Sequence, residues 1–398
     1  MSVDAAPPAA QSTSPAEAPS ADWSALLDRR LDEIRAAGRW RAYRDFDADG
    51  PRGTLTATGT PVVSFASNDY LGLTTHPAVV AAAKGALDRW GTGTGGSRLI
   101  TGARPVHREL EEELAAWKGT ERAVLFPSGF AANLGVLTTL GAAGTRIVSD
   151  ARNHASIIDG TRLARAAVVV WGHGDLDQLD ALLAADDAPT LVVADTVFSM
   201  DGDVLDVAAV GDRCRRHGAV LVLDEAHAVL GPHPEPAALD GVEVVRVGTL
   251  SKTLGALGGF AACSERVADL LVNVARSGIF TTALSPADTA AALAALRVLR
   301  SEEGDDLVAT LRRHVDRLRP GHPSPIVPVV LGDEQLALDA AARLLDRGLL
   351  VPAIRPPTVA PGTSRLRVTF SAAHTDDEVN RLLAALAEVP APSPAPAP

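Results

Sequence analysis

The chain of 398 residues has little of three things: cysteine, positive charge and long apolar runs. Its only two cysteines, Cys214 and Cys263, have the spacing of neither a disulfide framework nor a thiolate metal site. The net charge of −12 argues against nucleic acid as a partner, because phosphate binding needs a basic surface. No stretch approaches the roughly 20 apolar residues of a membrane span. We therefore expect a cytoplasmic protein that binds neither nucleic acid nor membrane.

The two ends of the chain are rich in Ala, Pro and Ser, a composition that cannot bury a core. The beginning also lacks the basic and apolar regions of a secretory signal. Over the whole chain 46% of residues are hydrophobic, which is enough for one large and one smaller domain. The predicted regions are a disordered tail (1–22), an N-terminal segment (23–60), a large domain (61–285), a small domain (286–388) and a second disordered tail (389–398).

Short apolar runs alternate with helical stretches in the large domain. The runs are AVLF (123–126), RIVS (146–149), AVVVW (167–171), TLVVAD (190–195), AVLVLD (219–224), VEVVRVG (242–248) and GGFAA (258–262). Continuous apolar runs indicate strands that are covered on both faces, so these seven predict a mostly parallel sheet with helical crossovers. A helix is expected over 23–43. After Pro286, helices around IVPVVLG (326–332) and RLRVTFS (365–371) predict a smaller α+β domain. The fold class is therefore α/β.

Lys252 and Asp224 stand at the ends of two of these predicted strands. Lys252 lies in GTLSKTLG (248–255), and Asp224 begins the segment DEAH (224–227). Pyridoxal phosphate needs both groups, because an amine forms an imine with its aldehyde while a carboxylate keeps its pyridine nitrogen protonated. The pair predicts pyridoxal phosphate as the cofactor.

Other readings of these motifs lack the context that they require. The segment 91–96 matches G-x-G-x-x-G, but it follows a helical stretch rather than a strand, so we interpret it as a place of close backbone approach. The DEAH segment is similar to a helicase motif, yet the sequence contains no G-x-x-x-x-G-K-[ST] loop. Asp224, His227 and His154 could together ligate zinc, but Lys252 would then have no explanation. We expect no metal.

Three further segments follow predicted strands. Ser128-Gly129-Phe130 precedes a helical run, and a helix N-terminus offers free N–H groups to a phosphate. His154 could stack on a planar ring, or it could be a solvated or capping residue. Ser199 could hydrogen-bond the cofactor or cap the next helix.

Arginines recur near the C-terminus. Arg355 precedes two prolines, which predicts a fixed, extended loop, and Arg365 and Arg367 lie in a predicted strand. Guanidinium groups suit the bidentate recognition of carboxylates, although surface arginine is the alternative interpretation.

Together these segments resemble the α-oxoamine synthases, a branch of the fold-type-I pyridoxal-phosphate enzymes. The resemblance covers Trp23 to Leu386 and lies in SNDYLGL (67–73), TGGSRLITG (94–102), HRELEEELAAW (107–117), SGFAAN (128–133), NHASIIDG (153–160), VFSMDGD (197–203), DEAHAVLG (224–231), GTLSKTLG (248–255) and RPPTVAPGTSRLR (355–367). It implies a large cofactor-binding domain with a mostly parallel seven-stranded sheet and a smaller C-terminal domain.

The resemblance implies four catalytic residues. Lys252 would hold the cofactor and later remove the α-proton of the amino acid. Asp224 would pair with the pyridine nitrogen, His227 with the ring oxygen, and His154 would stack on the ring. Further cofactor contacts are implied for Gly129, Phe130, Ser199 and Thr249 and, across a homodimer interface, for Thr281 and Thr282.

The resemblance also implies the substrates. Within the family, the chain looks most like members that condense L-alanine with a pimeloyl thioester and release CO2 in the formation of biotin. Arg367 would bind the amino-acid carboxylate, and Thr358, Arg355 and Arg41 would line the acyl site. The alternatives are a family member that uses glycine or serine with another acyl thioester, and a non-catalytic protein that retains the fold.

Overall fold

The computed structural model describes residues 22–233 and 236–389, so both predicted disordered tails lie almost entirely outside the described residues. The chain divides into two compact units, one up to Asp45 and the other from Phe46 onward. The first unit contains α1 (Trp23–Ala36), which begins where the Asp22 carboxylate accepts two backbone N–H groups. The sequence predicted this helix to continue to residue 43. It ends earlier because Gly38 adopts a positive φ of 62°, which helices use to terminate.

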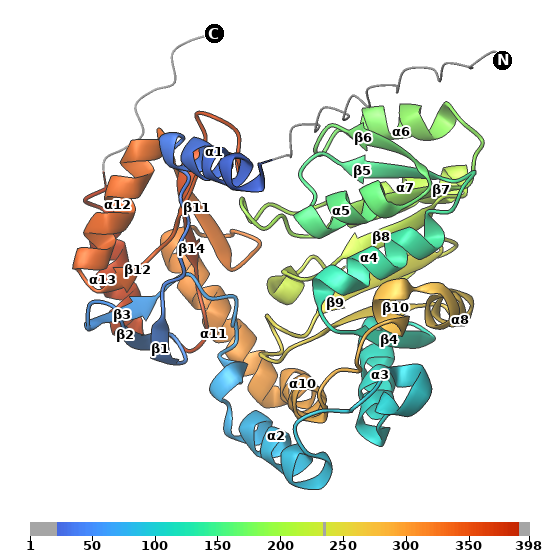
Figure 1. Ribbon diagram of the computed structural model, residues 1–398, viewed down its shortest axis with the longest axis horizontal. Helices are drawn as coiled ribbons and strands as arrows, with labels where there is room; N and C mark the ends of the chain where they lie inside the picture. The colour runs from blue at the N-terminus through green and yellow to red at the C-terminus, as the bar shows by residue number, and fades with distance from the viewer. Residues whose placement is uncertain (1–21, 234–235, 390–398) are drawn as a thin grey trace, which may run out of the picture. The chain divides into compact units, whose positions relative to one another are not determined.

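The second unit is built on a seven-stranded sheet with the order β4-β10-β9-β8-β7-β5-β6 (Figure 1). Its strands are β4 (Arg122–Phe126), β5 (Arg146–Asp150), β6 (Ala167–Trp171), β7 (Thr190–Asp195), β8 (Val220–Asp224), β9 (Val244–Thr249) and β10 (Gly259–Cys263). Only β10 runs antiparallel to its neighbours, β4 and β9. All seven strands coincide with the predicted apolar runs, so the mostly parallel sheet is confirmed.

Both faces of this sheet are covered by helices, which explains the continuous apolar runs. In β7, Leu191 and Val193 pack in a cluster with α4 (Gly129–Leu140), α5 (Ala155–Leu163) and α8 (Glu265–Val274). Val192 and Ala194 pack in a second cluster with α6 (Leu176–Ala184) and α7 (Val207–His217). Alternate side chains of one strand therefore enter different cores. The helices of the second unit are α2 (Pro77–Trp90), α3 (Pro105–Lys118), α4 (Gly129–Leu140), α5 (Ala155–Leu163), α6 (Leu176–Ala184), α7 (Val207–His217), α8 (Glu265–Val274), α9 (Arg276–Ile279), α10 (Pro286–Leu299), α11 (Glu302–Leu318), α12 (Glu334–Asp346) and α13 (Asp376–Leu386).

Two smaller sheets accompany the large one. The first has the order β1-β2-β3-β12 and the second the order β11-β14-β13. Their strands are β1 (Phe46–Asp49), β2 (Arg52–Leu55), β3 (Thr60–Ser64), β11 (Ile326–Gly332), β12 (Leu349–Leu350), β13 (Ala353–Ile354) and β14 (Ser364–Thr369). Because β12 pairs with β3, residues from the predicted N-terminal segment share a sheet with C-terminal residues. The boundaries expected at 60/61 and 285/286 lie inside the second unit and stay predictions.

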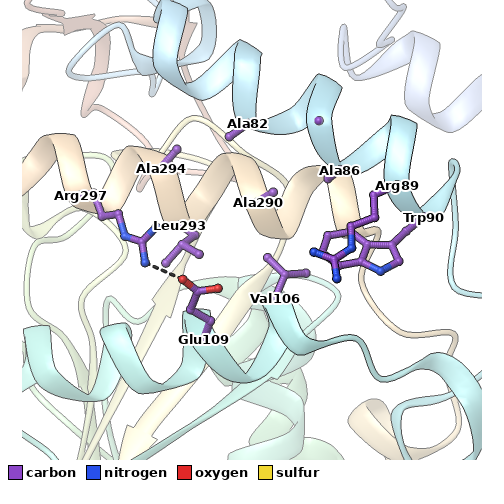
Figure 2. A pocket seen from close by; sticks show the side chains of 11 residues that line it. Ala82, Ala86, Arg89, Trp90, Val106, Glu109, Ala290, Leu293, Ala294 and Arg297 are labelled. Atoms are coloured by element: carbon purple, nitrogen blue, oxygen red, sulfur yellow. Dashed lines mark hydrogen bonds and ion pairs between the residues drawn. The ribbon is translucent and has the colours of Figure 1, made fainter.

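A groove of about 290 Å³ lies between α2, α3 and α10 (Figure 2). Small residues of α2 and α10 line it, and Glu109 of α3 forms an ion pair with Arg297 of α10 at 2.6 Å. None of its lining residues belongs to the predicted site. Within the described part of the chain, no helix is both long and apolar enough to cross a membrane.

Candidate active site

The predicted cofactor residues gather at the carboxyl ends of adjacent parallel strands. Asp224 is the last residue of β8 and lies beside Val247 of β9, while Lys252 follows the end of β9 by three residues. Asp195 ends β7 and pairs in register with Asp224. Ligands bind at this edge in open α/β sheets, because the loops that leave parallel strands converge there.

Lys252 lies in a buried chain of hydrogen bonds. Its Nζ is 2.7 Å from His227 Nε2, and His227 Nδ1 is 2.5 Å from the hydroxyl of Tyr70. Tyr70 donates to Asn68 Oδ1, which also accepts from Arg367, so the Tyr70 oxygen is available to accept from His227 Nδ1–H. His227 Nε2 can then accept a hydrogen bond from the Lys252 amine.

Burial sets the protonation of these groups. It lowers the pKa of Lys252 to about 8, because the ammonium form loses its hydration. Burial likewise holds the pKa of His227 well below its usual range, and the nearby cations Lys252 and Arg367 lower it further. His227 is therefore a neutral imidazole, and about a tenth of the Lys252 amine is unprotonated at pH 7.

Asp224 is fixed by donors on two sides. Asn133 Nδ2, from α4, donates to Asp224 Oδ2 at 2.6 Å, and the backbone N–H of Ala226 donates to Oδ1 at 2.9 Å. Asn133 Nδ2 also donates to Ser156 Oγ at 2.9 Å, and that hydroxyl lies 2.8 Å from His154 Nδ1. A hydrogen-bonded chain thus links Asp224 to His154.

His154 is also held through its backbone. It is the N-cap of α5, and its N–H donates to Asp195 Oδ2 at 2.7 Å. Asn153 Oδ1 in turn accepts the N–H of Asp195. Burial and the nearby Asp224 charge raise the pKa of Asp195 well above its usual value. Through these two hydrogen bonds, the end of β7 holds the turn that carries His154.

The N-terminus of α4 lies against Thr249, as a phosphate cradle requires. Ser128 caps the helix, so the N–H groups of Gly129 and Phe130 point out of its first turn. A Cβ atom on Gly129 would lie 3.1 Å from Thr249 Cβ, which would crowd the space between them. This N-terminus, the Lys252 amine and the Asp224 carboxylate form a set of groups that fits pyridoxal phosphate. The Thr249 hydroxyl beside them donates to the carbonyl of Gly258 at 3.1 Å in this structure.

Arg367 approaches the same site from the three-stranded sheet. It is buried in β14, and its Nε donates to the backbone carbonyl of Ser199 at 2.6 Å. Its Nη2 is 3.3 Å from Asn68 Oδ1. The structure therefore brings Ser199 and Arg367 into contact, and burial rules out the surface-arginine alternative for Arg367.

The remaining predicted residues form no hydrogen bond or ion pair with Lys252 in the described part of the chain. Arg41 is exposed in the first unit. Thr358 is exposed, and Arg355 lies 3.7 Å from Glu334. Thr281 and Thr282 lie beside Ala283, whose N–H donates to the carbonyl of Gly96 in the Gly-rich segment. Among the described residues, no hydrogen bond or ion pair joins these predicted residues to Lys252.

Four polar residues of the site were given no role from sequence. Tyr70, Asn68 and Asn133 lie within the SNDYLGL and SGFAAN segments, and Asp195 ends an apolar run in the same way as Asp224. That shared position, a carboxylate at the end of a neighbouring parallel strand, was the available signal for Asp195.

Comparison with known proteins agrees with this geometry. Residues 60–386 match the aminotransferase class I and II family. The chain belongs to that family. An 8-amino-7-oxononanoate synthase of Burkholderia thailandensis is 47% identical over 383 residues, which are 91% of this chain and 97% of that protein.

Solved structures show the same relationship. A serine palmitoyltransferase from S. paucimobilis with bound PLP and myriocin has a TM-score of 0.83 and 30% identity, covering 92% of this chain and 97% of that chain. The 8-amino-7-oxononanoate synthase of Francisella tularensis has a TM-score of 0.68 and 26% identity, covering 82% and 97%. These relatives place the chain among the α-oxoamine synthases, and they confirm the predicted fold, enzyme class and cofactor.

Proposed function

We propose that the protein condenses L-alanine with a pimeloyl thioester, giving 8-amino-7-oxononanoate, CO2 and the free thiol. The observation that carries this proposal is the 47% identity to a named 8-amino-7-oxononanoate synthase over 91% of the chain. The buried lysine, carboxylate and arginine supply the groups that this reaction needs. Biotin formation is the corresponding biosynthetic role.

Lys252 is the proposed base. Bound pyridoxal phosphate supplies an aldehyde that couples to amines and a protonated ring that accepts electrons from the α-carbon. Lys252 Nζ removes the α-proton of alanine, for which its lowered pKa of about 8 is suited, because a base works best with a pKa near the working pH. In the cofactor-free structure, this amine lies 2.7 Å from His227 Nε2.

Asp224 and His154 hold the ring in place. The Asp224 carboxylate, fixed by Asn133, would keep the pyridine nitrogen protonated, and His154 would stack on the ring face. Ser199 and His227 would bind the ring oxygen, with His227 in the tautomer that carries its proton on Nε2 and accepts from the Tyr70 hydroxyl at Nδ1. The phosphate would be held by the N–H groups of Gly129 and Phe130 and by Thr249.

Arg367 binds the amino-acid carboxylate. Its Nε is already occupied by the Ser199 carbonyl, which leaves the Nη groups to donate. Thr358 and Arg355 line the acyl site in this proposal, and a role of Arg41 in acyl binding stays a prediction.

We also propose a homodimer in the cytoplasm, with Thr281 and Thr282 reaching the partner's phosphate site. Leu99, Ile100 and Phe280 support it, because they are 55%, 79% and 72% exposed and flank the segments concerned. Both described cysteines are free and buried, as a reducing compartment permits. Light scattering tests the assembly: a fully active monomer would contradict it.

Turnover with a panel of substrates tests the reaction. Alanine, glycine and serine are each combined with pimeloyl, acetyl, succinyl and palmitoyl thioesters, and products are identified by mass spectrometry. The proposal expects alanine with pimeloyl thioester to react best. The second candidate is serine with a long acyl thioester, which the structural match to a serine palmitoyltransferase favours. No product from alanine and a pimeloyl thioester would refute the first.

A further inference from the structure

The turn Ser199–Asp203 lies between the large sheet and the three-stranded sheet. The N–H of Phe198 donates to the carbonyl of Asp203 at 3.0 Å, which closes the turn. Gly202 has a φ of 68°, and a Cβ atom there would collide with the carbonyl oxygen of Ile326 in β11. The turn therefore packs directly against the smaller sheet, and no larger residue fits its tip.

Two arginines of β14 bind this turn from the side of the smaller sheet. Arg365 forms an ion pair with Asp201, and only 7% of the Arg365 side chain is exposed. Arg367 donates from Nε to the carbonyl of Ser199 at 2.6 Å. Because the two arginines are separated by one residue in a strand, they lie on the same face, and both point to the turn.

A histidine between two carboxylates holds the turn from the side of the large sheet. His173 Nε2 is 2.6 Å from Asp203 Oδ2, and its Nδ1 is 3.0 Å from Asp150 Oδ1 at the end of β5. Phe198 meets the imidazole edge-on, with ring centroids 4.3 Å apart. The Arg152 guanidinium is 3.7 Å from Asp203. These two hydrogen-bonded carboxylates raise the pKa of His173 to about 9, so it is an imidazolium at neutral pH.

We propose that Asp201 and His173 are positioning residues for the amino-acid carboxylate, because together they fix the turn whose Ser199 carbonyl sets the direction of the Arg367 guanidinium. Asp201 fixes the turn against β14 through Arg365 and also lies 3.5 Å from Arg152 on the side of the large sheet, where His173 holds the turn. Neither residue touches the substrate. This inference rests on the proposed role of Arg367.

The geometry of Arg367 explains why the turn matters. Its guanidinium is planar, so the Nε contact to Ser199 determines where both Nη groups point. Nη1 donates to Thr369 Oγ1 at 3.1 Å and Nη2 to Asn68 Oδ1 at 3.3 Å. A movement of the turn would therefore rotate the donors available to a carboxylate without removing any of them.

The test measures binding of the amino acid without the acyl substrate. The pyridoxal-phosphate-loaded protein is titrated with L-alanine, and the Kd is read from the change in cofactor absorbance. Asp201→Asn should raise this Kd about tenfold and His173→Gln about threefold, since misplacement of a binding group by about 1 Å can cost up to about a hundredfold. Asp201→Glu keeps the charge and should recover part of the loss.

The matched control is Glu109→Gln, which removes an ion pair to Arg297 in the groove of Figure 2. That pair is half-exposed, with side chains 51% and 52% accessible, so the Kd should stay within about twofold. An unchanged Kd in folded, cofactor-loaded Asp201→Asn would overturn the proposal. A variant that loses cofactor affinity as strongly as alanine affinity and also melts at a lower temperature would overturn the proposal as well. That result would show that the residue supports the fold in general and does not specifically position Arg367. If Asp201→Asn does not fold, the Kd for alanine is measured in Asp201→Glu and His173→Gln instead. An unchanged Kd in both of these variants would overturn the proposal.

A pH series adds a readout specific to the imidazolium. The groups that face His173 are Asp150, Asp203 and, beyond them, Arg152. As pH rises through about 9, wild-type His173 loses its proton, so the Kd ratio between His173→Gln and wild type should fall toward one. A constant ratio from pH 7 to 10 would contradict the role of the charge. If wild type binds glycine or serine in place of alanine, the proposed function fails, while the same titration with that amino acid still tests the turn.

Discussion

The amine of Lys252 and the guanidinium of Arg367 are held in different ways. Lys252 follows a core strand of the large sheet, and Asp224 ends the adjacent strand. Arg367 lies in the smaller sheet, and its partners Ser199 and Asn68 are about 170 and 300 residues away in sequence. Strand geometry thus fixes the lysine end of the site, whereas the fit between two sheets fixes the arginine end. We expect changes at the lysine end to affect chemistry, and changes at the arginine end to affect amino-acid binding.

The largest effect should come from Lys252→Ala. Loss of the base and of the covalent cofactor attachment should lower kcat by at least about a thousandfold, since general bases contribute about 10²–10⁴ and covalent attachment adds to this. Steady-state turnover and the cofactor absorbance measure both losses. Lys84→Ala, an exposed change on α2, is the control and should behave as wild type. Retained turnover in Lys252→Ala would reject the assignment of the base.

Arg367→Lys should weaken the use of alanine without weakening the binding of the acyl thioester. A lysine keeps the charge but loses the planar fork, so kcat/KM for alanine should fall about 30- to 100-fold, consistent with the loss of a charge-assisted bidentate contact. The KM for the acyl thioester should change less than about twofold, because the substitution leaves the residues proposed to bind that substrate unchanged. An equal rise in the KM for alanine and the KM for the acyl thioester would contradict the view that the arginine end of the site binds only the amino acid.

Asn133→Ala should weaken the lysine end without touching the lysine. It removes the donor to Asp224 Oδ2 and the link to Ser156. Because hydrogen bonds to charged groups contribute about 1.5–3 kcal/mol, we expect pyridoxal-phosphate affinity to fall roughly 10- to 100-fold. Equilibrium dialysis measures this, and Asn273→Ala on α8, whose amide only donates to its own helix at Asp269, is a matched control. Unchanged cofactor affinity would show that Asp224 needs no support from α4.

The smallest effect is a pH dependence of cofactor capture. Lys252 in the cofactor-free protein has a pKa of about 8, and only its unprotonated amine attacks an aldehyde. The capture rate should therefore increase as pH rises through about 8 and level off above it. Stopped-flow absorbance with cofactor-free protein measures the rate. A midpoint near 10, the usual value for lysine, would show that burial does not lower this pKa.

The same contrast explains what the sequence could predict. The seven strands, Lys252 and Asp224 were found because an apolar run followed by a polar residue marks the end of a buried strand, which is a local signal. The contacts of Arg367 with Ser199 and of Asn133 with Asp224 join segments far apart in the chain, and no local pattern encodes such distances. The end of α1 at Ala36 was missed because the apolar residues Trp40 and Tyr43 continue beyond Gly38. The positions of Arg41, Arg355 and Thr358 in an acyl site stay predictions.

The central claim is that the buried lysine performs a condensation in which the amino-acid carboxyl group leaves as CO2. The most direct measurement uses L-alanine labelled with ¹³C at its carboxyl carbon, a pimeloyl thioester and the pyridoxal-phosphate-loaded protein. The account predicts that all of the label appears in CO2, that unlabelled 8-amino-7-oxononanoate forms in equal amount, and that Lys252→Ala forms neither. Label retained in the condensed product, or product formed by Lys252→Ala, would contradict it.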